Sequence, residues 1–192
     1  PRRRAELDPM QRGTLIHDAL EKLIAQGLDC SDEELHERVV EFGRQQLQTL
    51  YGDEEPPENM RSYFQALTDK IERLLKLFRK EFALTQFVPV AFEQKIGKEE
   101  GAVPTVEIPL DTGTLSLIGV VDRVDVYEKD GIKYLRVVDY KTGTKQFHLS
   151  DLLYGLNLQM FLYLMMLQQA DRQQGLQAVS TDAARVEPCG AL

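Results

Sequence analysis

Cysteine is scarce in this sequence, whose 192 residues include only Cys30 and Cys189. Two cysteines do not build a disulfide framework, and they are too few for a structural zinc or iron–sulfur site. We therefore expect two free thiols in a reducing compartment, which predicts a cytoplasmic protein.

Long apolar runs are also missing. No stretch approaches the roughly 20 consecutive apolar residues of a membrane helix. The amino-terminal sequence PRRRAELDPMQRG is not followed by the apolar core of a signal peptide. These absences argue against a membrane-spanning protein and predict no membrane partner. The chain begins without Met, which predicts a piece of a longer protein.

Positive charge is in deficit, because 23 Lys and Arg residues stand against 31 Asp and Glu residues and give a formal net charge of −8. A protein that grips nucleic acid by electrostatics alone usually has a basic surface. The acidic balance therefore argues against a simple nucleic-acid-binding module. It leaves room for an enzyme that recruits metal cations or receives its substrate from a partner.

Apolar residues are abundant enough for a sizeable core, since they make up 43% of the chain, and the length suits one compact domain. The spacing of these residues predicts three helices, over 13–26, 31–51 and 60–85. We expect the first helix to begin at Thr14 and to stop at Gly27, and the second to be capped by Ser31.

The composition changes after the third helix. Val, Ile, Phe and Tyr, separated by Gly, Pro and Asp, predict strands over 87–96, 103–110, 114–128 and 133–141. A further helix is predicted over 149–169 and a last strand near Arg185. The fold class is therefore α/β, with a helical front (1–86) before a mostly antiparallel sheet and its core helix (87–192), in one domain over 1–192.

The sequence GVVDRVDVYEKDGIKYLRVVDYK (119–141) is predicted to form a β-hairpin. Its centre, Asp130-Gly131, is a strong signal for a two-residue type I′ turn. Such a turn makes Lys129 face Ile132, and this pair sets the register of both strands.

This register determines which charged residues meet. It places Asp125 opposite Arg136, a favourable cross-strand ion pair, and Asp122 directly opposite Asp139. Two opposed carboxylates, with Cβ atoms ~5 Å apart, repel unless a proton or a cation lies between them. Oxygen ligands suit Mg²⁺ or Mn²⁺, so the pair predicts a divalent-metal site. Lys141 shares the strand face of Asp139 and is placed to orient a water there.

A purely structural interpretation stays open for these residues. Asp122 or Asp139 is able to cap a strand or to pair with Lys141 or Arg123, because Asp-x-Lys is a short and common pattern. The opposed position of Asp122 favours the metal site. Glu93, on the first predicted strand, is a further candidate for the same pocket.

Four motifs together resemble the PD-(D/E)XK nuclease superfamily, and more narrowly its RecB-like exonuclease domains. In chain order they are RGTLIHDALEKL (12–23), GVVDRVD (119–125), VVDYKTG (137–143) and NLQMFLYLMML (157–167). The resemblance implies a restriction-endonuclease-like core, in which a central mixed or antiparallel sheet is flanked by helices. It implies His17, Asp122 and Asp139 as metal ligands. The catalytic residues that it implies are Asp122, Asp139 and Lys141, with Gln159 and Tyr163 in support.

Each of these assignments has a plainer alternative. A lone histidine such as His17 is more often a surface or core residue than a metal ligand. Gln159 and Tyr163 lie on one helix face, where they also fit a polar edge on an apolar helix. The order of all four motifs along the chain favours the functional interpretation.

Within the superfamily, the chain most resembles the nuclease domain of AddB-type subunits of bacterial helicase–nucleases, which process double-strand DNA ends. This implies a Mg²⁺-dependent deoxyribonuclease, with Mn²⁺ as an alternative ion, that acts as an exonuclease in end processing and recombinational repair. It also implies DNA, delivered as a single strand, and a helicase–nuclease subunit as partners. That family holds a [4Fe–4S] cluster with four cysteines. Neither Cys30 nor Cys189 has that spacing, so we expect no cluster in this chain.

Two other classes of function stay open. A catalytically inactive module would keep the nuclease fold and bind DNA or a helicase partner. A different Mg²⁺-dependent phosphoesterase would act on small nucleotides. The third helix carries basic residues that either follow a DNA backbone or form a solvated face: Lys70, Arg73, Lys76, Arg79 and Lys80.

Overall fold

The computed structural model describes residues 7–140, 159–174 and 185–191. The chain divides into two compact units, Pro1–Thr85 and Gln86–Leu192, each with its own packing. That these units act as one domain over 1–192 stays a prediction. No helix within the described ranges is long and apolar enough to span a membrane.

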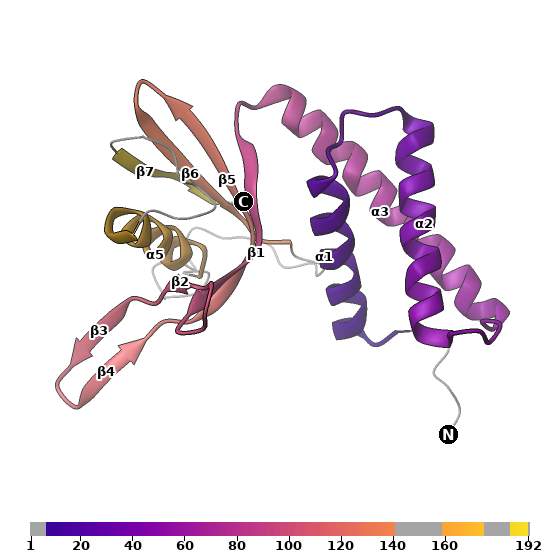
Figure 1. Ribbon diagram of the computed structural model, residues 1–192, viewed down its shortest axis with the longest axis horizontal. Coiled ribbons are helices and arrows are strands. Elements are labelled where there is room, and N and C mark those ends of the chain that lie inside the picture. Colours follow the sequence, from indigo (N-terminus) through magenta and orange to yellow (C-terminus); the bar gives the residue numbers. More distant parts are fainter. Residues whose placement is uncertain (1–6, 141–158, 175–184, 192) are drawn as a thin grey trace, which may run out of the picture. The chain divides into compact units, whose positions relative to one another are not determined.

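The first unit is helical and consists of α1 (Pro9–Ala25), α2 (Asp32–Tyr51) and α3 (Glu58–Leu84) (Figure 1). The predicted start of the first helix at Thr14 is wrong, because Asp8 is its N-cap. The Asp8 carboxylate accepts a hydrogen bond from the Gln11 backbone N–H at 2.9 Å, and the Gln11 side chain accepts from the Asp8 N–H at 3.2 Å. This capping box, with Pro9 in the first helical position, satisfies backbone donors that a start at Thr14 would leave open.

The predicted end of α1 and the predicted start of α2 are confirmed. Gly27 follows the last turn of α1 with a φ of +85°, the left-handed conformation that stops a helix. Ser31 caps α2 and accepts a hydrogen bond from the Glu34 N–H at 3.1 Å. Apolar side chains from all three helices are buried, among them Ile16, Leu20, Leu23, Leu35, Val39, Phe64, Leu67, Ile71 and Leu75.

The second unit contains a five-stranded mixed sheet among the described residues, in the order β2-β1-β5-β6-β7. Its strands are β1 (Val88–Gly97), β2 (Val103–Pro104), β5 (Gly119–Lys129), β6 (Ile132–Val138) and β7 (Arg185–Ala191). The central pairs β1–β5 and β5–β6 are antiparallel, whereas the outer pairs β1–β2 and β6–β7 are parallel. The predicted α/β class and mixed sheet are confirmed.

Two predicted strands are each divided in the structure. The expected strand 103–110 is β2 followed by β3 (Glu107–Leu110), and the expected strand 114–128 is β4 (Gly113–Ser116) followed by β5. The strands β3 and β4 pair with each other and form a separate hairpin that projects from the sheet (Figure 1). The five-stranded sheet therefore receives β2 from the first run and β5 from the second.

The β5–β6 hairpin has the predicted turn and register. Asp130 and Gly131 have φ angles of +53° and +74°, as a type I′ turn requires. Lys129 pairs with Ile132, and the ladder continues without a shift to the pair Arg123–Val138. This ladder ends one pair short of Asp122 and Asp139, because β6 ends at Val138.

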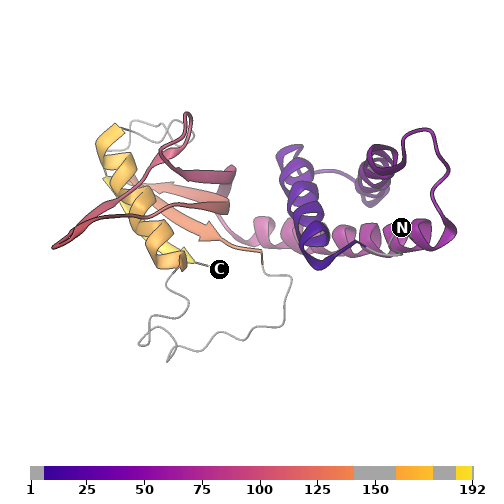
Figure 2. The same cartoon turned by 90° about the horizontal axis from the view of Figure 1, so that it is seen from below.

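Helix α5 (Gln159–Gln174) covers one face of the sheet (Figure 2). The core between them is apolar and includes Val121, Val124, Val126, Leu135, Val137, Tyr163, Leu164 and Leu167. The predicted helix 149–169 is confirmed from Gln159 onward, and its earlier part lies outside the described residues. The predicted last strand is confirmed as β7.

Candidate metal site at the start of the central strand

Asp122 lies near the start of β5, in the middle of the sheet, and is 9% exposed. Its Oδ2 atom accepts a hydrogen bond from the backbone N–H of Tyr140 at 2.5 Å. The segment that follows β6 therefore contacts the Asp122 side chain through the Tyr140 amide.

A second carboxylate, Glu93 of β1, approaches Asp122 from the other neighbouring strand. Phe92 pairs with Arg123 and Gln94 pairs with Val121, so the register sets Glu93 opposite Asp122. One oxygen of each carboxylate lies within 4.8 Å of the other. Glu93, the further candidate for this pocket, therefore lies beside Asp122.

The backbone is irregular at this point. Glu93 has a φ of +45°, in the left-handed region that residues other than glycine rarely adopt. On β5, Val121 and Val124 are both in the core beneath α5, although residues three apart in a regular strand point to opposite faces. Strain of this kind costs about 1–3 kcal/mol per residue and gathers at functional sites. Both strands therefore depart from regular geometry where the two carboxylates meet.

The side chains of Arg123, Asp125 and Arg136 form a buried ion network. The Arg123 guanidinium donates to both oxygens of Asp125, at 2.7 and 2.9 Å. Arg136, which faces Asp125 in the ladder as predicted, donates to the same carboxylate at 2.6 and 2.9 Å. The side chains of Arg123 and Asp125 are both 0% exposed. Charges this deep are tolerated only when they are paired and hydrogen-bonded.

Tyr140 extends this network toward Asp122. Arg123 donates a hydrogen bond to the Tyr140 hydroxyl at 3.1 Å, and its guanidinium lies 5.8 Å from the centre of the ring. Burial raises the pKa of Tyr140 to about 12, so the phenol keeps its proton near neutral pH. The contacts of the Tyr140 hydroxyl and of its backbone amide were not predicted. The alternation of Arg123 and Asp125 on a buried strand was the available signal for the network.

The predicted Asp-x-Lys pair is described only in part. Asp139 is half-buried, directly after the last residue of β6. Lys141 lies outside the described residues. The roles of Asp139 and Lys141, and the approach of Asp139 to Asp122, therefore stay predictions.

Gln159 and Tyr163 contact each other on α5. The Gln159 amide donates to the Tyr163 hydroxyl at 2.8 Å, and Tyr163 is 6% exposed. A Cβ atom at Gly119 would lie 2.5 Å from this hydroxyl and 2.7 Å from the ring. Gly119, the first residue of β5, thus admits the Tyr163 ring beside the strand that carries Asp122. The glycine before the Val-Val-Asp run was the missed signal.

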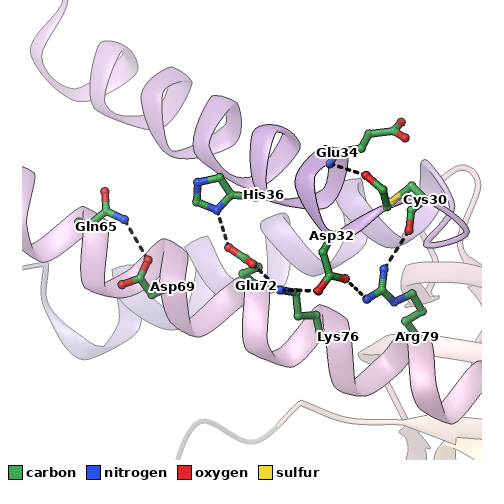
Figure 3. A network of polar contacts seen from close by, with 10 residues as sticks. Cys30, Asp32, Glu34, His36, Gln65, Asp69, Glu72, Lys76 and Arg79 are labelled. Carbon is green, nitrogen blue, oxygen red and sulfur yellow. Dashed lines mark hydrogen bonds and ion pairs between the residues drawn. The ribbon is translucent and has the colours of Figure 1, made fainter.

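The remaining predicted residues belong to the helical unit. His17 is half-buried on α1. On α3, Lys70, Arg73 and Lys80 are exposed, whereas Lys76 and Arg79 form ion pairs with Asp32 of α2 (Figure 3).

Ion pairs with acidic residues of α2 and α3 explain why some of these basic residues are present on α3. Lys76 lies 3.1 Å from Asp32 and 2.8 Å from Glu72, and Glu72 in turn lies 2.8 Å from His36 Nδ1. Arg79 also donates to the Cys30 carbonyl at 2.9 Å (Figure 3). Two of the five predicted DNA-contacting residues therefore stabilise the packing of the helices.

The Glu93–Asp122 donor set fits a hard divalent cation. Both groups offer carboxylate oxygens, which are the ligands that Mg²⁺ and Mn²⁺ prefer, and one of them is largely buried. Mg²⁺ sites typically use one or two carboxylates and keep other positions for water and substrate phosphate.

Comparison with known proteins agrees with this geometry. The family model of the PD-(D/E)XK nuclease superfamily matches residues 1–189. Similar curated proteins include the B-type subunit of the ATP-dependent helicase/deoxyribonuclease of Clostridium kluyveri, 36% identical over 162 residues, and that of Acetivibrio thermocellus, 34% identical over 170 residues. The alignments cover 79% and 82% of this chain but 14% of each relative.

The family match also accounts for the mixed sheet flanked by α5, which is consistent with a restriction-endonuclease-like fold. The resemblance inferred from the four motifs is confirmed, because the matched region includes all of them. The chain belongs to the PD-(D/E)XK nuclease superfamily.

Proposed function

We propose that this chain is a metal-dependent deoxyribonuclease domain that hydrolyses phosphodiester bonds. The observation that carries the proposal is the approach of the Glu93 and Asp122 carboxylates within 4.8 Å. The Glu93 backbone is strained at this point, and Asp122 lies in a motif that resembles those of the nuclease superfamily. A protein gains no stability from bringing two carboxylates together. A cation that binds both would explain why the arrangement exists.

The proposed ligands are Asp122, Asp139 and Glu93, with His17 supplying a nitrogen. Mg²⁺ bound there would neutralise phosphate charge and increase the acidity of a water. Lys141 is proposed to orient the attacking water and to stabilise the charge that develops on the phosphate. The Gln159–Tyr163 pair is proposed to position the substrate or the site around it.

The substrate is proposed from the relatives. Their name, which describes one component of an ATP-dependent helicase/deoxyribonuclease, supports DNA as the substrate and a helicase–nuclease assembly as the context. We propose exonuclease action on a single strand during double-strand break processing and recombinational repair, in the bacterial cytoplasm. Exposed Lys70, Arg73 and Lys80 remain proposed contacts for the DNA backbone, with Lys76 and Arg79 as weaker candidates because they bind acidic side chains.

Calorimetric titration with Mn²⁺ tests the metal site. The wild-type chain is expected to bind, and Asp122→Asn, which removes the charge and keeps the shape, is expected to lose binding. Asp111→Asn is the matched control, because this exposed residue lies in the β3–β4 turn of the same unit. Absence of binding by the wild-type chain would sink the proposed function.

Degradation of labelled single-stranded DNA tests the activity. Release of nucleotides that depends on Mg²⁺ and on Asp122 supports the nuclease, whereas hydrolysis of free nucleotides alone would support a small-molecule phosphoesterase. Mn²⁺ binding without either activity would support an inactive module that binds DNA or a helicase partner.

A further inference from the structure

A continuous chain of contacts joins the buried ion network to the metal-site aspartate. Arg136 donates to Asp125, Asp125 accepts from Arg123, and Arg123 donates to the Tyr140 hydroxyl at 3.1 Å. The backbone N–H of the same tyrosine donates to Asp122 at 2.5 Å. Tyr140 therefore contacts the network with its side chain and the metal-site aspartate with its backbone.

The planar guanidinium of Arg123 is able to contact Asp125 on one side and Tyr140 on another. A guanidinium is planar, and two of its nitrogens already donate to the two oxygens of Asp125. The third nitrogen points away from that carboxylate, and it reaches Tyr140. Because Arg123 and Asp125 are both 0% exposed, water has little access to replace these contacts.

The segment that the network fixes is short. Regular strand pairing ends at Val138, so the ladder does not determine the position of residues 139 and 140. Cation–π and hydrogen-bond contacts from Arg123 hold the Tyr140 side chain. Fixing that side chain also fixes the amide that binds Asp122 and the backbone of Asp139 beside it.

We propose that Tyr140 and Arg123 are positioning residues for the metal site: they hold the Tyr140 amide on Asp122 and so orient this carboxylate toward the cation. The inference rests on the proposed function, since it concerns how tightly that site binds its metal. Groups that orient metal ligands typically change metal affinity by 10–100-fold when they are removed. Neither Tyr140 nor Arg123 needs to touch the metal for this effect.

The test measures Mn²⁺ affinity by calorimetry on the whole chain, well below the unfolding temperature of each variant. Tyr140→Phe removes only the hydroxyl and keeps the ring and the backbone N–H, and we expect affinity to fall about 10-fold or more. Tyr134→Phe is the matched control, because Tyr134 lies on β6 and stacks on Tyr127 at a ring distance of 5.9 Å. It is expected to bind like the wild type. Arg123→Lys, which keeps the charge but not the planar fork, is a second variant with the same expected loss.

A spectroscopic reading separates positioning from a general loss of stability. The Tyr140 amide proton, hydrogen-bonded to a carboxylate, is expected to resonate downfield in the wild type and to move upfield in Tyr140→Phe without metal. Wild-type affinity and an unmoved amide in Tyr140→Phe would overturn the inference while leaving the proposed function intact. An equal loss in Tyr134→Phe would overturn it as well. No binding by any variant or by the wild type would overturn the proposed function and this inference together.

Discussion

Replacing Asp125 by alanine should destabilise the sheet unit severely. The Asp125 carboxylate accepts four hydrogen bonds, two from Arg123 and two from Arg136, and is 0% exposed. Its removal takes from the buried Arg123 guanidinium the carboxylate to which two of its nitrogens donate. Breaking a buried ion pair from one side typically costs about 3–5 kcal/mol.

The structure indicates why we expect the free energy of unfolding to fall by this amount and not by more. Four charge-assisted hydrogen bonds at about 1.5–3 kcal/mol each would suggest more. The Arg136 side chain, however, is 11% exposed and has a route to solvent, whereas Arg123 has none. The unrelieved cost is therefore mainly that of one buried guanidinium. Even so, it is a large share of the roughly 5–15 kcal/mol that stabilises a typical domain.

Urea unfolding followed by circular dichroism measures this loss. With a slope of about 2 kcal/mol per molar urea, the midpoint of Asp125→Ala should fall by roughly 2 M. Glu55→Ala is the control, because Glu55 pairs with Arg61 at 2.9 Å while its side chain is 79% exposed, and it should leave the midpoint almost unchanged. A loss below about 1 kcal/mol in Asp125→Ala would refute the reasoning, since it would mean that Arg123 is easily hydrated.

Two further predictions concern packing and pH. Gly119→Ala places a Cβ atom 2.5 Å from the Tyr163 hydroxyl and should lower the free energy of unfolding in urea by about 1–3 kcal/mol. Adding Tyr163→Leu should recover part of that loss. Strictly additive losses in the double variant would contradict the clash. Hydrogen bonds from Lys76 and His36 lower the pKa of Glu72 below its ordinary value of 4.5, so its contribution to stability is present above that value and is lost as the pH falls through the lowered pKa. The thermal midpoint of Glu72→Gln should therefore lie below that of the wild type near neutral pH, and the difference should vanish in acid; a constant difference would contradict this linkage.

The elements that the sequence predicts well are those set by local chemistry. Asp130-Gly131 fixes a turn because both residues tolerate a positive φ, and a two-residue turn determines every pair of the ladder beyond it. Ser31 caps α2 because its hydroxyl reaches an N–H three residues away. Neither feature depends on residues distant in the chain.

The candidate site is harder to predict because it depends on the pairing of distant strands. Glu93 and Asp122 are 29 positions apart, and nothing in the sequence specifies that β1 pairs with β5 in the register that opposes them. The hairpin register identifies Asp122 as a candidate, but it specifies only the residue that faces Asp122 on β6, because a tight turn joins β6 to β5. It does not specify the residue that faces Asp122 on β1. The start of α1 is a local feature, and its prediction at Thr14 fails because Asp8, the residue before a proline, is the better cap.

The alternation along β5 limits how this domain is able to change in evolution. From Arg123 to Val126, charged and apolar side chains alternate between an ion network and the core beneath α5. Loss or gain of a single residue here would exchange the two sets, moving a guanidinium into the apolar core and a valine into the ion network. Insertions and deletions should therefore be excluded from this strand, while the β3–β4 hairpin, whose Leu110 and Leu115 are exposed, remains free to vary in length.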